Sequence, residues 1–264
     1  MRLALIGFGG LGRIVAAAVR NDSGIELVAV AARERQRADV LAMLGAVPVV
    51  QTAESLISAR PELVVECAGH EAFRQYAEPV LAAGIGLVAV SVGVLADAEY
   101  RERVLKAARA GKSALEIPAG AIGGVDAVAA ARNAGLTRVL YVTRKNPEAW
   151  RGTPAESMVD LGRVRTPLLF FDSDAAKAAL LFKSKANITA TLALAGLGFE
   201  ATRVQFWVDP AVTTSVHRIF AEGPCGSLEI DLHNEASPTD GKASLLAAMS
   251  IVRAIRSRTG VLRV

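Results

Sequence analysis

An apolar segment followed at once by three spaced glycines opens this sequence and constrains its fold more than any other feature. Residues 3–6 read L-A-L-I, and Gly7, Gly9 and Gly12 then precede apolar residues that recur at helical spacing. This order predicts a strand, a tight turn and a helix. The first glycine allows the turn, the second lets a pyrophosphate approach the backbone, and the third lets the helix pack closely on the strand.

The amide groups at the start of such a helix point at the phosphates of a bound dinucleotide. The strand before the glycines and the helix after them therefore favour dinucleotide binding over a purely structural turn. We expect cofactor contacts from the residues of this turn, which are Gly7, Gly9, Gly10, Leu11 and Gly12.

The end of the second predicted strand, residues 25–31, bears on which dinucleotide binds. An acidic residue about 20 residues past the glycines holds the ribose 2′-OH of NAD, whereas an arginine there accommodates the 2′-phosphate of NADP. Two alanines and then Arg33 follow this strand, with no acid at its end. Arg33 is predicted to bind the phosphate, unless it only begins a solvated helix. The expected cofactor is NAD or NADP, with NADP use favoured.

Composition excludes several classes of protein. The chain has 264 residues, 52% of them hydrophobic, which is enough for a sizeable core. No apolar run reaches the roughly 18 residues of a membrane span, so we expect no membrane association. The net charge of +4 is spread along the chain, which suits an anionic cofactor or a small acidic substrate and argues against nucleic acid. The first residues do not read as a signal peptide, so we expect a cytoplasmic protein.

Metal binding and disulfide bonds are not expected. Cys67 and Cys225 are too few and too far apart for a disulfide framework or a zinc site, and we expect both to be buried. Asp172 and Asp174 lack the histidine neighbours and the spacing of a metal site.

The distribution of predicted elements indicates two domains. Over residues 1–120 apolar strands alternate with helices, which predicts a doubly wound parallel sheet of the Rossmann type with ligands at the carboxyl ends of its strands, where Ala68 stands. Over residues 121–240 more strongly alternating strands predict an α+β domain with a mixed or antiparallel sheet, including a helix over residues 174–182 with Ser173 as its N-cap. The closing helix, within residues 241–264, is expected to complete the first domain.

Several residues of the second domain are candidates for chemistry. His217 is a candidate for proton transfer in an amine or hydroxyl oxidation, and the alternative is that it merely caps a strand. Asn187 is either a helix N-cap or a hydrogen-bonding partner of a ligand. A substrate carboxylate would need cationic partners, and each candidate is otherwise a solvated charge. These candidates are Arg144, Lys145 and Lys185.

Ordered segments along nearly the whole chain resemble the L-aspartate dehydrogenase family. They are G-F-G-G-L-G at 7–12, P-A-G-A-I-G-G at 118–124, T-R-K-N-P at 143–147, A-N-I-T-A-T-L-A-L-A at 186–195, D-P with V-H-R-I-F within 209–220, and K-A-S-L-L-A-A-M-S-I-V-R at 242–253. The resemblance implies oxidation of L-aspartate to iminoaspartate, or to oxaloacetate and ammonia, with NAD or NADP. It also implies a role in NAD biosynthesis.

Residue roles follow from the same resemblance. His217 matches the active-site histidine of the family, and Ala121 and Asn187 match positions that contact the cofactor. Family members are typically homodimers built through the second domain, so residues 121–240 are expected to serve both substrate binding and dimerisation. Two family segments are altered here, at 184–191 and 237–244, which bears on substrate specificity. The alternatives are an imine or semialdehyde reductase like dihydrodipicolinate reductase or homoserine dehydrogenase, and a non-catalytic dinucleotide sensor.

Overall fold

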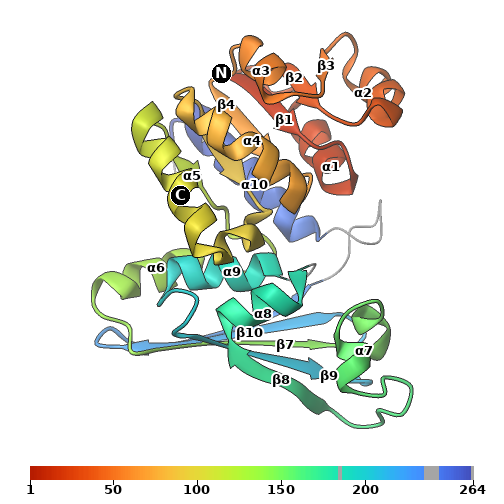
Figure 1. The fold of residues 1–264 in the computed structure, drawn as a ribbon, viewed down its shortest axis with the longest axis vertical. Coiled ribbons are helices and arrows are strands. Elements are labelled where there is room, and N and C mark those ends of the chain that lie inside the picture. Colours follow the sequence, from red (N-terminus) through yellow and green to blue (C-terminus); the bar gives the residue numbers. More distant parts are fainter. Residues whose placement is uncertain (184–185, 235–243, 263–264) are drawn as a thin grey trace. The chain divides into compact units, whose positions relative to one another are not determined.

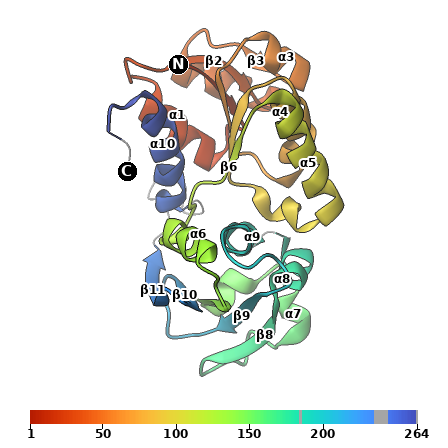
Figure 2. The ribbon, with the colours of Figure 1, turned by 90° about the vertical axis from the view of Figure 1, so that its left-hand side faces the viewer.

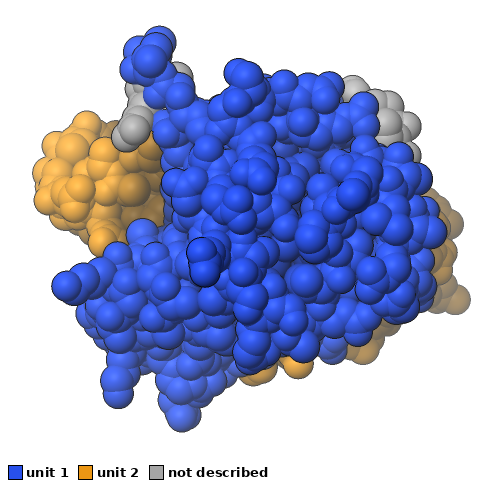
Figure 3. All heavy atoms as spheres, turned by 90° about the horizontal axis from the view of Figure 1, so that it is seen from above, with its two compact units in different colours: residues 1–120, 237–264 blue, residues 121–236 orange. Residues whose placement is uncertain are grey.

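The structure is a computed structural model that describes residues 1–183, 186–234 and 244–262. The chain divides into two compact units, which Figure 3 colours separately. Unit 1 comprises Met1–Gly120 and Ser237–Val264, and unit 2 comprises Ala121–Ala236. The chain therefore leaves the first unit once and returns to it at its end. Within the described residues no helix is both long and apolar enough to cross a membrane.

Unit 1 is built on a six-stranded sheet in the order β3-β2-β1-β4-β5-β6, with every neighbouring pair parallel. The strands are β1 (Arg2–Ile6), β2 (Glu26–Ala31), β3 (Val49–Val50), β4 (Leu63–Glu66), β5 (Gly86–Ala89) and β6 (Leu115–Glu116). The central strands are buried on both faces, which explains why they read as continuous apolar runs. The predicted Rossmann-type parallel sheet is confirmed.

Helices cover both faces of this sheet, as Figure 2 shows. Helices α1 (Gly10–Val19) and α10 (Leu245–Thr259) pack together on one face. The helices of the other face, which pack on one another, are α3 (Ala53–Ser58), α4 (His70–Ala82) and α5 (Ala98–Gly111). Short helices η1 (Glu34–Gln36) and α2 (Arg37–Leu44) follow β2, and η2 (Val92–Ala96) follows β5. Ile251, Val252 and Ile255 of α10 are buried in the same core as Val15 and Val19 of α1.

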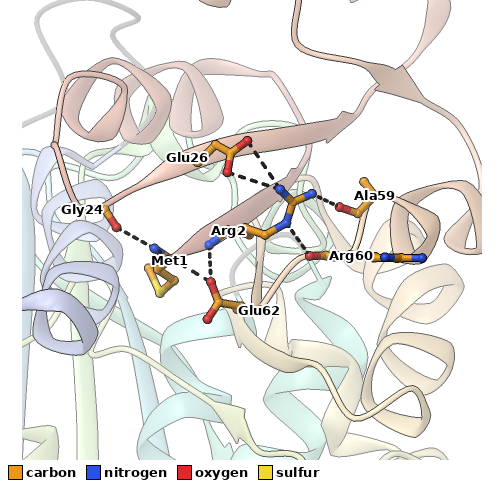
Figure 4. A network of polar contacts seen from close by, with 7 residues as sticks. All are labelled: Met1, Arg2, Gly24, Glu26, Ala59, Arg60 and Glu62. Carbon is orange, nitrogen blue, oxygen red and sulfur yellow. Dashed lines mark hydrogen bonds and ion pairs between the residues drawn. The ribbon is translucent and has the colours of Figure 1, made fainter.

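Arg2 ties three segments together at the amino ends of the strands (Figure 4). Its guanidinium donates from Nη2 to the carbonyl oxygen of Ala59 at 2.6 Å and from Nε to that of Arg60 at 2.9 Å. It also pairs with the Glu26 carboxylate on β2 at 3.3 Å. The Arg2 amide donates to the Glu62 carboxylate at 2.6 Å. Arg2 thereby connects β1 to β2 and to the segment between α3 and β4.

Replacing Arg2 by methionine is expected to lower the free energy of unfolding by about 1–2 kcal/mol, because two backbone carbonyls lose a charged donor. Urea titration followed by circular dichroism measures this change. Glu26→Gln is the matched variant: it removes only the exposed ion pair and should cost less than about 0.5 kcal/mol. Equal losses in the two variants would assign the effect to the ion pair instead of the carbonyl contacts.

Unit 2 is built on a five-stranded mixed sheet in the order β11-β10-β7-β9-β8. The β7–β9 pair is parallel and the other three pairs are antiparallel. The strands are β7 (Arg138–Lys145), β8 (Leu168–Asp174), β9 (Thr202–Val208), β10 (Ser215–Gly223) and β11 (Gly226–Asn234). The prediction of a mixed or antiparallel sheet is confirmed in its mixed form.

The sheet of unit 2 has one face covered by helices (Figures 1 and 2). These are α6 (Val125–Asn133), α8 (Ala175–Leu181) and α9 (Ala186–Ala195), while η3 (Pro147–Trp150) and α7 (Ala155–Met158) lie between β7 and β8 in the chain. An aromatic cluster fills part of the core, where the buried Trp150, Phe182 and Phe206 rings lie 5.0–6.1 Å apart between centroids. Because successive side chains of a strand point to opposite faces of the sheet, one face is buried and the other is partly exposed.

Two local predictions in unit 2 were wrong. The N-cap of α8 is Asp174, whose carboxylate accepts a hydrogen bond from the Lys177 amide at 2.7 Å, and not Ser173. Strand β8 continues to Asp174 because its last residues still pair with β9, which carries Ser173 into the sheet. Cys225 is exposed because it lies in the turn between β10 and β11, whereas Cys67 is buried as expected.

Candidate functional site

A cleft of about 520 Å³ lies at the carboxyl ends of the strands of unit 1. It is lined by the turn after β1, by Ala31–Arg33 at the end of β2, and by the Cys67–His70 segment after β4. A pocket of this size at the strand ends of a parallel sheet is the usual place for a ligand in such a fold. Of the residues predicted to contact a cofactor, this cleft brings together Gly7, Gly9, Arg33 and Ala68.

The three glycines of the turn have different surroundings. Gly7 has a φ of +96°, and a Cβ on it would come within 2.7 Å of Ala68. A Cβ on Gly12 would overlap the carbonyl oxygen of Gly7, so this glycine serves helix packing. A Cβ on Gly9 would meet no protein atom within 4 Å, although Gly9 lines the cleft. Packing within the protein therefore does not explain Gly9, whereas close approach of a ligand does.

The first turn of α1 also fits a phosphate. Gly9 is the N-cap of α1, and as a glycine it offers no side chain to accept hydrogen bonds from the helix amides. Gly10 and Leu11, predicted to contact the cofactor, are the first two residues of this helix. Unsatisfied amides at a helix N-terminus attract anions through their hydrogen bonds and the helix dipole. The turn and the helix together fit the pyrophosphate of a dinucleotide.

The segment after β2 places the cation Arg33 at the cleft, whereas the neighbouring acid Glu34 does not line it. Arg33 is exposed and lines the cleft. The neighbouring Glu34 carboxylate instead accepts two hydrogen bonds from the Arg37 guanidinium, at 2.6 and 3.1 Å, and one from Gln51 at 2.9 Å. Gln36 donates to the carbonyl oxygen of Phe8 at 2.9 Å and so ties this segment to the glycine turn. The geometry here is open to a 2′-phosphate.

Glu66, the last residue of β4, was not singled out by the sequence, yet its carboxylate holds the loop whose residues Ala68 and Gly69 line the cleft. Its side chain is fully buried. Its Oε1 accepts hydrogen bonds from the Ala68 and Gly69 amides at 2.7 and 2.8 Å and from the Ser91 hydroxyl at 2.8 Å. Its Oε2 accepts one from the Ser91 amide at 3.0 Å. An acid closing a run of three buried apolar residues, Leu63–Val65, was the signal that could have found it.

His217 occupies the covered face of the sheet in unit 2. It is 3% exposed, and its Nδ1 shares a hydrogen bond of 2.7 Å with the hydroxyl of Tyr141 on the neighbouring strand β7. The two rings are nearly parallel, with 6.0 Å between their centroids. Thr143, which faces His217 in the strand register, donates to the carbonyl oxygen of Val216 at 3.1 Å. His217 is thus an oriented ring within β10 and not a residue capping a strand. Tyr141 was not among the residues predicted to be functional.

The surroundings of His217 keep its ring neutral. Burial lowers the pKa of His217 to about 3, and the positive charge of Lys145 acts in the same direction. A neutral ring has one N–H and one lone pair. When Nδ1–H donates to the Tyr141 oxygen, Nε2 carries the lone pair and can accept a proton. When the Tyr141 hydroxyl donates to Nδ1, Nε2 carries the hydrogen.

The three predicted carboxylate partners fall in different places. Lys145 lies two residues beyond Thr143 on β7, so it shares the face of His217. Arg144 points to the opposite face, where it pairs with Asp209 at 3.7 Å and lies over the Trp207 ring at 4.8 Å. Lys185 lies outside the described residues.

The two positions assigned to cofactor contact by family resemblance both lie in unit 2. The Ala121 carbonyl oxygen accepts a hydrogen bond of 2.5 Å from the Asn234 amide group. Asn187 is the second residue of α9, which begins at Ala186, so it lies in the first helical turn and not at the N-cap. Among the described residues, no three His, Cys, Asp or Glu side chains cluster in the way a metal ion would require.

Two protein families match most of the chain between them. The C-terminal domain family of aspartate dehydrogenase matches residues 126–258. The NAD-binding domain family of homoserine dehydrogenase matches residues 7–118, which include the glycine turn.

Similar proteins cover the whole chain. It is 40% identical to an L-aspartate dehydrogenase of Polaromonas sp. and 38% identical to one of Ralstonia nicotianae, and each match covers 98% of this chain and 97% of the relative. Among solved structures, aspartate dehydrogenase from Thermotoga maritima superposes with a TM-score of 0.78 at 22% identity, covering 100% of this chain and 99% of that one. A hyperthermophilic archaeal homoserine dehydrogenase, solved with NADPH, has a TM-score of 0.63 at 11% identity, over 98% of this chain and 97% of its own. At these identities the two structures show a shared fold.

Proposed function

This chain belongs to the L-aspartate dehydrogenase family, and we propose that it oxidises L-aspartate to iminoaspartate, which water converts to oxaloacetate and ammonia. It is an NAD(P)-dependent dehydrogenase. The observation that most supports the reaction is the combination of a dinucleotide-type cleft in unit 1 with a buried, neutral and oriented histidine in unit 2. Such a histidine suits a reaction in which a carbon loses hydride while its nitrogen loses a proton.

The residues of unit 1 fit NAD or NADP. The glycine turn and the first amides of α1 would hold the pyrophosphate, and the exposed Arg33 would meet the 2′-phosphate of NADP. We propose that Ala68, beside Gly7 in the cleft, contacts the same cofactor, and that Ala121 and Asn187 do so from unit 2. When bound, the nicotinamide accepts the hydride.

Two side chains on one face of the unit 2 sheet have different roles toward the substrate. Lys145 binds a carboxylate of the substrate, and His217 takes the proton of its amino group at Nε2, with Nδ1–H donating to Tyr141. The charge of Lys145 lowers the pKa of His217 in the free protein, so a carboxylate bound to Lys145 raises that pKa again. The histidine therefore becomes a better base when the substrate is present. Arg144 and Lys185 are the remaining candidates for the second carboxylate.

The test is the absorbance of the reduced cofactor with L-aspartate and either NAD or NADP. Reduction that depends on L-aspartate is the expected result. A panel of semialdehydes and cyclic imines, assayed as oxidation of the reduced cofactor, covers the reductase alternatives. Turnover of those compounds alone would contradict the aspartate assignment, and dinucleotide binding without any turnover would indicate a sensor.

Arg33→Gln is expected to lower kcat/KM for NADP by about tenfold, because a charged donor to the 2′-phosphate is lost. The value for NAD should stay within about twofold, since NAD has no 2′-phosphate. Initial rates with both cofactors measure the two effects. Arg35→Gln is the matched control, because it removes the same charge from an exposed residue that does not line the cleft. Equal losses with NAD and NADP would contradict a specific role of Arg33.

We also propose a homodimer formed through unit 2. Its support is the partly exposed sheet face, where Leu140, Trp207 and Phe220 line a groove of about 400 Å³ beside Arg144. Light scattering should give twice the mass of one chain, and Phe220→Asp should lower that mass.

A product of this reaction can feed NAD biosynthesis, and dependence on NAD or NADP fits a cytoplasmic enzyme.

A further inference from the structure

The buried Glu66 carboxylate joins the ends of two neighbouring strands. Glu66 is the last residue of β4, and its carboxylate accepts hydrogen bonds from the amides of Ala68 and Gly69 after that strand. It also receives both the amide and the hydroxyl of Ser91, which follows β5. All four partners are donors, two of them backbone amides of one loop. A carboxylate that accepts four hydrogen bonds is matched to these donors in its ionised form, since a protonated oxygen would need an acceptor.

Two opposing effects act on this group. Burial raises the pKa of Glu66 above its ordinary value, and the hydrogen bonds from Gly69, Ser91 and Ala68 offset this only in part. Removing a charge from water is costly unless donors replace the solvent, and here the donors are fixed by the backbone. The protein therefore retains a buried acid next to the cleft-lining residues Cys67, Ala68 and Gly69, although a neutral side chain would avoid the cost of burial. Retention of this charge despite the free-energy cost of burying it indicates that the charge has a role.

The strand order indicates which part of the cofactor lies above Glu66, given the dinucleotide binding proposed above. The pyrophosphate of a bound dinucleotide would lie on the turn after β1, and Arg33 after β2 would mark the side of the adenosine ribose. Strand β4 lies on the other side of β1, and β5 lies next to β4. The nicotinamide half would therefore extend over the ends of β4 and β5, which Glu66 connects.

We propose that Glu66 is an electrostatic residue that stabilises the oxidised nicotinamide relative to the reduced form. The oxidised ring carries a positive charge and the reduced ring is neutral, so a nearby fixed negative charge favours the oxidised state. Because Glu66 is fully buried, water screens its field only weakly. Glu66 thereby biases the bound dinucleotide toward the form that accepts hydride.

The experiment is calorimetric titration of the protein with the oxidised and reduced forms of whichever dinucleotide it binds more tightly, without substrate. In the wild type the oxidised form should bind at least as tightly as the reduced form. In Glu66→Gln the dissociation constant of the oxidised form should rise about tenfold relative to that of the reduced form. A loss that is only structural would weaken both forms by the same factor.

Ser91→Ala is the matched control. It removes the hydroxyl hydrogen bond to Glu66 but leaves the charge, so any loss of affinity should be equal for the two redox forms. An unchanged ratio in Glu66→Gln overturns the proposal. If Glu66→Gln does not fold, the wild type alone tests the proposal. Binding of the reduced form more than tenfold more tightly than the oxidised form would then overturn it. Failure of the wild type to bind either form would contradict the proposed function itself.

Discussion

Replacing His217 by glutamine is expected to lower kcat by roughly 10²-fold or more, because the proposed proton acceptor of the reaction is lost. The dissociation constant for the dinucleotide should stay nearly unchanged, since the cleft of unit 1 is left intact. Single-turnover measurements of cofactor reduction, with titration of the dinucleotide in parallel, separate the two quantities. His233→Gln is the control, because His233 is an exposed histidine of the same sheet.

The pH dependence of the wild type gives a second measurement on the same residue. Because burial and Lys145 lower the pKa of His217 to about 3, its ring stays neutral in the free enzyme between pH 5 and pH 8. The profile of kcat/KM should therefore lack an acid limb near the ordinary histidine pKa of about 6.5. In the profile of kcat any acid limb should still lie below that value, because bound substrate offsets only the smaller effect of Lys145 while burial continues to lower the histidine pKa. Unchanged turnover in the glutamine variant would remove His217 from the mechanism.

Replacing Gly9 by valine is expected to weaken dinucleotide binding by roughly 10²-fold or more, because the new side chain occupies the path of the pyrophosphate. Thermal unfolding should be nearly unaffected, since a Cβ at this position meets no protein atom within 4 Å. Calorimetric titration and differential scanning calorimetry measure the two effects.

Gly12→Ala provides the contrast. Its methyl group would overlap the Gly7 carbonyl oxygen, so this variant should lose stability first. A Gly9→Val protein that binds the dinucleotide normally would show that the ligand does not cross the turn. A Gly9→Val protein that unfolds early would show that packing, and not ligand approach, requires this glycine.

The first unit was predictable because its signals are local. Residues 1–20 contain a buried apolar strand, three glycines at fixed spacing and an amphipathic helix. Each of the three glycines has a separate steric reason. The role of Glu66 is not local in this sense, because Ser91 stands 25 residues further along the chain. Only the parallel pairing of β4 with β5 brings the two residues together.

In the second unit the alternation of apolar residues predicted strands but not their partners. The parallel pair β7 and β9 is separated in the chain by β8, α8 and α9, so no turn signal connects its strands. The antiparallel pairing of β8 with β9 extended β8 to Asp174 and displaced the expected N-cap at Ser173. The contact of His217 with Tyr141 depends on the register of β10 against β7, which no pattern within either strand encodes.

The return of the chain to unit 1 has a consequence for biosynthesis on the ribosome. Helix α10 supplies Ile251, Val252 and Ile255 to the core that buries α1, and it is translated after the whole of unit 2. The nascent glycine-turn helix therefore emerges more than two hundred residues before the partner that covers its apolar side. Unit 2, which is continuous in sequence, can complete its sheet first. The dinucleotide-binding unit, although begun first, cannot complete its core until α10 has been synthesised.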